Sequence, residues 1–438
     1  MKTNTYCKYY LVLLAFLISS SLYAQSKTLQ KTYSWKYSVS ADVNLSFNNY
    51  DCDLNIQTWD KPTIEYKLQV TVTGLKPEDS EILNNYLENL SFHTSANRVT
   101  IDNRFWNERN TRNNKTKLEL RNGEKITLTK FQISGELKVP TGTNLILDSK
   151  YSNIEMDDIY GKLNLKLYND KLYAGNVGSN LSLEAKYSTI EFENIKDITA
   201  DLYNTDMEAK DMGNLKIDSK YSKIFCNEVQ NVDLNSYNDK LVFESTENVS
   251  FDAKYSSFIA KKSKMLKVDT YNCTMVIDEI ENIEIDSKYS KFEFKNGGNC
   301  TLSSSFNDGV KYLNLNKLKI YESKYGTYKI EELTDKLEVT DGYSDKFEII
   351  KTSMNLKGIK VNEKYGKIRI GIPEQLDFHL KARIKYPKLN IDDAGVTTKI
   401  KILENSDLEY EGIKGTEIEN MPLIRITGYN VSLTINEY

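Results

Sequence analysis

An all-β solenoid, in which one short β-stranded unit stacks on the next, is the fold that this sequence predicts. Three observations lead to it. Apolar and polar residues alternate over short stretches, as in strands with one buried face. Thirteen corner aromatics recur between Tyr151 and Tyr365. A set of apolar residues also recurs at intervals of seventeen without interruption: Leu181, Ile198, Leu215, Val232, Val249, Leu266, Ile283 and Cys300. A constant short period is typical of a solenoid.

One repeat unit, called a rung below, is illustrated by residues 181–197, with Leu181 as position one. Positions one and three are apolar, position five is small or apolar, and a second alternation begins at Ile190. We therefore expect at least two short strands in each rung. A two-residue turn with Asn in second place, such as Gly213-Asn214, is expected to end the rung, because Asn tolerates left-handed backbone.

The direction of the strands follows from their length. If all rungs coil in one direction, equivalent positions stack about 4.8 Å apart and form a single-stranded parallel β-helix with rungs of about 17 residues. An antiparallel meander is the alternative. With one strand per repeat it needs strands of about fifteen residues, which is longer than usual. With two strands per repeat it is sterically possible, but it does not explain the alternation described next.

Charged and aromatic residues alternate from rung to rung at the corner. Position six reads Lys186, Tyr203, Lys220, Tyr237, Lys254, Tyr271 and Lys288. Position four is mostly acidic and reads Glu184, Asp201, Asp218, Asn235, Asp252, Asp269 and Asp286. Interleaved Tyr separates the like charges and brings each ammonium near a ring, which allows cation–π contacts. The ladder is interpreted either as a solvated salt-bridge surface or as a strip that binds a cation or a glycan on its Tyr rings.

The first 24 residues have the pattern of a secretory signal peptide. Lys2 and Lys8 precede or flank a short apolar run, and Leu22-Tyr23-Ala24 is a suitable cleavage site. We therefore expect an exported protein, in the periplasm or on the outer cell surface, with no transmembrane segment. Loss of the two lysines changes the formal charge from −4 to −6 (−4 − 2). An acidic chain disfavours nucleic acid as a partner.

The remainder, 25–438, is expected to form one continuous domain with three regions. Region 25–144 holds β rungs, a capping helix over 76–90 that starts near Pro77, and a basic loop over 103–125. The loop is either a solvated insertion or a contact for an anionic glycan or membrane surface.

The second region, 145–370, holds the regular repeats. The third, 371–438, holds C-terminal rungs and a cap. Tyr429, Leu433 and Ile435 repeat the offsets of a rung, so the last residues are expected to rejoin the stack.

Residues for catalysis or metal binding are sparse. His93 and His379 are isolated in the sequence and are interpreted as surface or cap residues. Cys226 and Cys300 fall in inward apolar columns, where Cys acts as a small hydrophobe. We expect no structural disulfide, no zinc site and no cofactor.

Several motifs resemble one known family. They include Asn49-Tyr50, Thr58-Trp59-Asp60-Lys61, the Lys-Tyr-Ser and Lys-Tyr-Gly corners such as Lys324-Tyr325-Gly326, and the closing Ile426-Thr427-Gly428-Tyr429. Together they resemble the "putative adhesin" β-helical domains of unknown function, which are common in exported proteins of Bacteroidetes-type bacteria. The resemblance covers nearly all of the chain after the signal peptide. It implies a parallel β-helix in the cell envelope.

The function that these observations favour is that of a non-enzymatic, adhesin-like or structural envelope protein that binds a glycan or a protein partner. A β-helical polysaccharide lyase or hydrolase is the alternative. Such an enzyme needs a local cluster of acids, often with Arg, in a groove. Here the acids run in a long ladder, and 145–350 holds no Arg.

Overall fold

The computed structural model describes residues 28–391 and 394–438, so the expected signal peptide at 1–24 lies outside the described residues. Strands make up most of these residues, as an all-β fold requires. The chain divides into two compact units, Met1–Met156 and Asp157–Tyr438. Each unit is described by itself. The boundaries expected at 144 and 370, and the single continuous domain, remain predictions.

The first unit combines antiparallel and parallel pairing. β4 (Thr63–Thr73) lies antiparallel between β1 (Thr28–Ser38) and β10 (Lys130–Pro140). β3 (Cys52–Trp59) then runs parallel to β10 on one side and to β12 (Asn153–Met156) on the other.

The neighbouring strands of this unit repeat the arrangement. β2 (Asn44–Tyr50) lies between β6 (Arg98–Asp102) and β11 (Asn144–Lys150). The short β5 (His93–Ser95) pairs antiparallel with β6. The rung at 44–59 is thus inserted between strands that follow it in the sequence.

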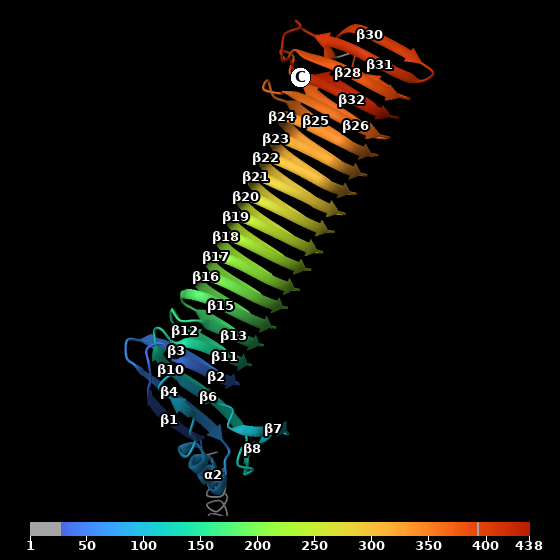
Figure 1. Cartoon of the computed structure of the whole chain (residues 1–438). Helices are drawn as coiled ribbons and strands as arrows, with labels where there is room; N and C mark the ends of the chain where they lie inside the picture. The colour runs from blue at the N-terminus through green and yellow to red at the C-terminus, as the bar shows by residue number, and fades with distance from the viewer. Residues whose placement is uncertain (1–27, 392–393) are drawn as a thin grey trace, which may run out of the picture. The chain divides into compact units, whose positions relative to one another are not determined.

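The predicted capping helix is α2 (Pro77–Glu88). Pro77 begins the helix, Glu78 and Asp79 lie in its first turn, and Leu83 and Leu87 are buried. These features suit a helix start because Pro needs no amide partner there and acidic groups favour the N-terminal dipole. Lys31 of β1 pairs with Glu88 at 2.5 Å. Figure 1 shows α2 beyond β1 and β4, at the end of this unit.

The basic segment at 103–125 is not the loop that the sequence led us to expect. It contributes to a separate three-stranded antiparallel sheet of β7 (Trp106–Arg112), β8 (Lys115–Leu120) and β9 (Lys125–Leu128). Its arginines are largely engaged within the unit: Arg104 lies 4.8 Å from the ring of Tyr50, Arg109 pairs with Asp51, and Arg121 pairs with Asp102. The loop prediction failed because Phe105, Trp106, Leu118 and Leu120, hidden among charges, are buried.

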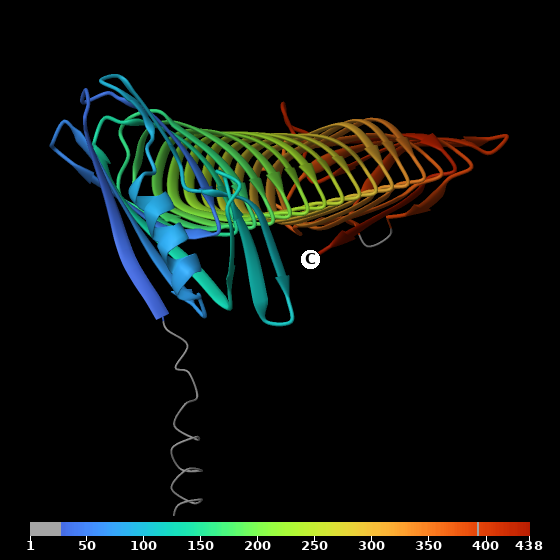
Figure 2. The same ribbon diagram turned by 90° about the horizontal axis from the view of Figure 1, so that it is seen from below.

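The second unit is the parallel β-solenoid that the period predicts, and Figures 1 and 2 show its strands stacked one on the next. Leu215, Val232 and Val249 lie in register on consecutive parallel strands. Its opening strands are β13 (Leu163–Tyr168), β14 (Lys171–Ala174) and β15 (Val177–Lys186). The full rungs are β16 (Thr189–Tyr203), β17 (Asp206–Lys220), β18 (Lys223–Tyr237), β19 (Lys240–Lys254), β20 (Ser257–Tyr271), β21 (Thr274–Lys288), β22 (Lys291–Phe306), β23 (Gly309–Lys324) and β24 (Thr327–Tyr343).

Each full rung is one long bent strand of 15 to 17 residues, and not two short strands separated by a turn. At Gly213-Asn214, where a turn was expected, the backbone stays extended and Asn214 pairs in register with Asn231. Asn231 donates from Nδ2 to Asn214 Oδ1 at 2.7 Å, and Asn248 donates to Asn231 at 3.0 Å. From Asn214 to Asn248 the bend is therefore held by an amide ladder, which Met265 interrupts in the next rung, and it needs no left-handed residue. Gly213 fits because a β-carbon there would overlap the Lys196 carbonyl oxygen.

The C-terminal region closes the second unit out of sequence order. β26 (Gly358–Lys364) and β27 (Lys367–Ile372) continue the stack after β25 (Lys346–Thr352). The last strands, β32 (Leu423–Tyr429) and β33 (Ser432–Glu437), run parallel to them. On their other side lie the earlier β28 (Phe378–Lys385) and β29 (Lys388–Asn390). The prediction that the last residues rejoin the stack is confirmed.

An antiparallel hairpin covers the end of the second unit. β31 (Asp407–Lys414) pairs antiparallel with β28 and with β30 (Thr397–Glu404). Every residue of β30 is exposed, and its lysines discourage pairing with another strand edge.

Candidate functional site: the tyrosine corner

The sharp corner of each rung is made by a single residue in the left-handed conformation. At position seven, φ is +57° for Tyr187 and +48° for Asn204, and similar positive values recur at this position in the following rungs. Asn adopts this conformation readily, whereas a bulky side chain rarely does. Seven tyrosines of the second unit nevertheless occupy it, with φ between 54° and 62°: Tyr187, Tyr221, Tyr255, Tyr289, Tyr325, Tyr365 and Tyr386. Strained backbone of this kind is often maintained for function.

Position eight, directly after the left-handed residue, points inward and replaces a lost backbone hydrogen bond. Ser256 Oγ accepts the Asp239 N–H of the preceding rung at 3.1 Å, and Asp308 Oδ1 accepts the Ser290 N–H at 2.7 Å. Thr205, Ser222 and Cys273 take part in the same column. The sequence analysis overlooked this column, although its Ser, Thr, Asp and Cys residues also recur every seventeen positions.

Aromatic rings form one continuous column along the corner. Where position six is Tyr, it supplies the ring, and where position six is Lys, the left-handed Tyr at position seven supplies it. Successive centroids lie 5.3–5.7 Å apart in edge-to-face geometry, which suits aromatic quadrupoles. The column consists of Tyr168, Tyr187, Tyr203, Tyr221, Tyr237, Tyr255, Tyr271, Tyr289, Phe306, Tyr325, Tyr343, Tyr365, Tyr429 and Tyr386.

The predicted Lys/Tyr alternation is present in the register: Lys186 pairs with Tyr203, Tyr203 with Lys220, and so on to Lys288. The expected cation–π contacts are absent, since within 28–391 and 394–438 none of Lys186, Lys220, Lys254 and Lys288 lies over a ring. The rings pack on one another instead, and the lysines remain exposed beside them.

The acidic residues of position four form an exposed column on the same face as the lysines. Asp201, Asp218, Asp252, Asp269 and Asp286 occupy equivalent registers, with Asn235 between them. Three of these carboxylates, those of Asp252, Asp269 and Asp286, border a shallow hollow of about 300 Å³ together with Lys267. They follow the stack without converging on a point. Among the described residues, no three His, Cys, Asp or Glu side chains are grouped to hold a metal ion.

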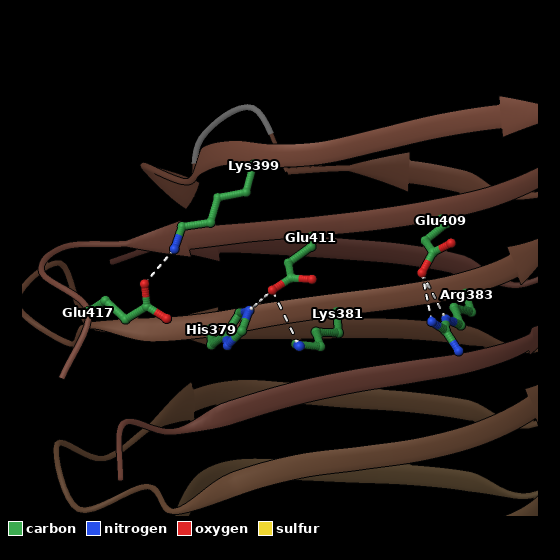
Figure 3. A network of polar contacts seen from close by, with 7 residues as sticks. All are labelled: His379, Lys381, Arg383, Lys399, Glu409, Glu411 and Glu417. Atoms are coloured by element: carbon green, nitrogen blue, oxygen red, sulfur yellow. Dashed lines mark hydrogen bonds and ion pairs between the residues drawn. The ribbon is translucent and has the colours of Figure 1, made fainter. Parts of the chain in front are cut away.

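A second polar cluster, absent from the sequence interpretation, lies on the C-terminal sheet (Figure 3). His379 Nε2 lies 2.8 Å from Glu411 Oε1, and Lys381 lies 3.3 Å from the same oxygen. Partial burial acts to raise the pKa of Glu411, but the hydrogen bonds from Lys381 and His379 outweigh it and lower that pKa. Arg383 pairs with Glu409 on the same two strands at 2.7 Å. His379 is therefore engaged with β31, because antiparallel pairing places 381 opposite 411.

Two buried carboxyl groups meet inside the corner near the C-terminal end. Gly366 occupies position eight, and the side chain of Glu363 fills the space where its side chain would lie. Asp345 accepts the Gly326 N–H at 2.6 Å, and both carboxyl groups are almost fully buried. Burial raises the pKa of Asp345 to about 6. Burial, together with the charge of Asp345, raises the pKa of Glu363 to about 8. Protonation of Glu363 relieves the repulsion between the pair.

The described cysteines are buried and unreactive in character. Cys52, Cys226, Cys273 and Cys300 are free thiols, and Cys226 and Cys300 lie in the inward columns where the sequence placed them. Burial raises the pKa of Cys300 to about 12, which disfavours the nucleophilic thiolate.

Comparisons with known proteins give distant structural similarities. No family model and no curated protein matches the chain. A "putative cell adhesion protein" from Clostridium sporogenes is similar over 94% of this chain and 100% of that one, at 9% identity and a TM-score of 0.18. A "putative lipid binding protein" from Parabacteroides distasonis and a "putative adhesin" from Parabacteroides merdae match at 11% and 12% identity, with TM-scores of 0.18 and 0.19. Each covers 70% of this chain and 96% of its own.

Two of these three proteins carry adhesion names, as the motif resemblance led us to expect. At such identities and TM-scores the similarities carry no argument about activity. Within the described residues, no helix has the length and apolar character needed to cross a bilayer.

Proposed function

We propose that this chain is an exported, non-enzymatic envelope protein of the adhesin-like type, in the periplasm or on the cell surface. Its corner column binds a linear polysaccharide. The continuous column of half-exposed rings is the observation that carries this proposal. Rings such as Tyr187 and Tyr221 are 46% exposed, although their backbone is held in a conformation that tyrosine disfavours. A purely structural corner would be served by Asn, as alternate rungs demonstrate.

The chemistry of the column suits a sugar polymer. An aromatic face offers a large, rigid and amphipathic contact area at a low cost in conformational entropy. The hydroxyls from Tyr187 to Tyr289 form no hydrogen bond with any described part of the chain, so they are free to bond sugar hydroxyls. The repeat of about 4.8 Å along the column gives an extended polymer the same contact at every rung or every second rung. The lysines beside every second ring share this face with the acidic column, so both neutral and anionic polymers are suitable probes.

Binding to a panel of neutral and anionic linear polysaccharides tests the proposal by affinity electrophoresis and calorimetry. The variant Tyr221→Asn/Tyr255→Asn removes two neighbouring left-handed rings and inserts the residue that Asn204 and Asn238 already supply at that position. We expect its affinity to fall roughly tenfold, at about 0.5–1.5 kcal/mol per aromatic contact.

The matched control is Tyr160→Asn/Tyr321→Asn, which removes two exposed tyrosines outside the column. It is expected to bind as the natural chain does. Equal binding by both double variants would contradict a role for the column, and a chain that binds only a protein partner would contradict the choice of glycan.

A further inference from the structure

An apolar strip lies on the opposite face of the solenoid from the acidic column. This second face presents the outward positions nine, eleven and thirteen of each rung, which follow the corner. Most of its residues are charged or polar. Position eleven, however, is apolar in four consecutive rungs and acidic on either side: Glu208, Phe225, Val242, Ile259, Val276 and Glu293.

The strip is accessible to solvent. Ile259 is 37% exposed, and Phe225, Val242 and Val276 are half-buried. Inward neighbours already fill the core of these rungs, since Ile224, Leu241 and Phe258 are buried. The outward side chains of the strip are therefore not needed to fill the core of the unit. Contiguous apolar residues on a charged surface commonly mark a site of association.

Charged residues border the strip in a pattern that complements itself. At position nine the four rungs carry Lys223, Lys240, Ser257 and Thr274, and at position thirteen they carry Asn227, Glu244, Lys261 and Asp278. Suppose that a second copy packs face to face about a two-fold axis between the rungs of Val242 and Ile259. Each position then faces the same position of the other copy, and the order of the rungs is reversed.

This arrangement gives six kinds of facing pair over the four rungs. Phe225 faces Val276, and Val242 faces Ile259. Glu244 faces Lys261, so the ion pair that these two residues form within one copy is extended across the axis. In the remaining three kinds of pair, Lys223 faces Thr274, Lys240 faces Ser257, and Asn227 faces Asp278. None of the six places like charges opposite each other.

We propose that the second face is a self-association surface, on which two copies of this chain pack antiparallel through the strip from Phe225 to Val276. Four rungs with three outward positions cover roughly 20 Å by 17 Å. This is about 340 Å² per copy, less than half of what a stable interface buries on each partner, so the dimer is weak and depends on concentration. The corner column lies apart from this strip on each rung. The proposal therefore does not depend on the proposed glycan binding, and two antiparallel copies would present two columns to a polymer.

Sedimentation velocity of the chain without its signal peptide, over a wide range of concentrations, tests the proposal. The natural chain is expected to shift from monomer to dimer as concentration rises. Ile259→Lys buries charges at the centre of the interface and is expected to weaken the dimer by roughly tenfold or more. Ser250→Lys is the matched control, because it adds the same charge to an exposed position of the neighbouring rung on the other face. It is expected to dimerise as the natural chain does.

A charge exchange tests the antiparallel arrangement. Glu244→Lys places two lysines opposite each other and weakens the dimer, whereas Glu244→Lys/Lys261→Glu restores it. Circular dichroism checks that each variant is folded. A monomer at every concentration, a dimer insensitive to Ile259→Lys, or a double variant that fails to recover would each overturn the proposal.

Discussion

Each rung reverses direction twice, and the two reversals are built on different principles. At the corner, one left-handed residue turns the chain abruptly, and an inward side chain at position eight replaces the hydrogen bond that the turn breaks. At the bend, around Asn214 and Asn248, the backbone stays extended and in register, and exposed amides bond to one another along the stack. The side-chain hydrogen bonds of the corner are thus buried, whereas those of the bend are exposed to solvent.

The contrast teaches where a stacked fold is sensitive to substitution. A buried donor that loses its acceptor costs about 1–3 kcal/mol, whereas an exposed one can turn to water. Corner substitutions should therefore cost much more than bend substitutions, even though the chain reverses at both places in every rung. Four substitutions would break or sharpen this comparison, and they are taken in order of decreasing effect.

Asp308→Ala should have the largest effect. The Asp308 carboxylate accepts the N–H groups of Ser290 at 2.7 Å and Phe306 at 3.1 Å, and the hydroxyls of Ser287 and Ser305. Its loss leaves several buried donors without partners, and we expect the free energy of unfolding to fall by about 3–5 kcal/mol. Urea denaturation measures this. A loss below that of a bend substitution would refute the contrast.

Glu363→Gln should change the pH dependence of stability. The pKa values of Asp345 and Glu363, about 6 and about 8, lie above the ordinary values of 3.8 and 4.5. The unfolded chain therefore releases these protons more readily. The contribution of the two protonated groups to the free energy of unfolding is complete below about pH 4, and it is lost as the pH rises through 6 and 8.

We expect Glu363→Gln, which stays neutral, to be more stable than the natural chain at pH 9 by roughly 2–4 kcal/mol, with little difference at pH 4. Denaturation at both pH values measures this. Parallel pH profiles for the two proteins would contradict a buried carboxyl pair. Glu374→Gln, at an exposed carboxyl, is a suitable control.

Ser256→Ala should have a smaller effect, because it removes one acceptor from the corner column. The Asp239 N–H and the Ser236 hydroxyl both donate to Ser256 Oγ, at 3.1 and 2.9 Å. We expect a loss of about 1–2 kcal/mol in the free energy of unfolding. Ser256→Thr should be nearly neutral, since Thr205 occupies the equivalent position of another rung. A Thr variant as unstable as the Ala variant would point to packing as the cause.

Asn248→Ala should have the smallest effect. It removes one hydrogen bond of the exposed amide ladder, and water can solvate the Asn231 oxygen that loses its donor. We expect a loss of about 0.5 kcal/mol, measured by the same denaturation experiment. A loss as large as that of Ser256→Ala would show that the bend and the corner depend on their ladders equally.

Much of the fold could be read from the period of seventeen, because a parallel stack repeats each inward residue directly beside its equivalent. The period did not reveal how the chain turns. Asn214 is a residue type common in turns, but here it lies in extended backbone and bonds to Asn231 of the next rung. The left-handed residues are instead the Tyr and Asn of position seven. Nor could the period show that Tyr187 and Tyr203 share one column, because they come from different positions of neighbouring rungs.

Contacts between segments far apart in the sequence could not be predicted from the repeat for another reason. His379 and Glu411 meet because β28 and β31 run antiparallel, and nothing in the local spacing of either strand encodes that pairing. The acidic and lysine residues at positions four and six lie exposed and in register on one face. Whether that face binds a ligand depends on chemistry that a repeat does not specify.

The insertion of β32 and β33 between earlier strands has a consequence for biogenesis. Synthesis delivers a chain from its N-terminus onward, yet the rung that links β26–β27 to β28–β29 is supplied by the late residues 423–437. The earlier rungs can therefore pair while the chain is still being synthesised. The strands β32 and β33, which lie between β26–β27 and β28–β29, can pair only after residues 423–437 have been made. A chain that stops short of residue 423 lacks the strands that pair with β26 and β27 on one side and with β28 and β29 on the other.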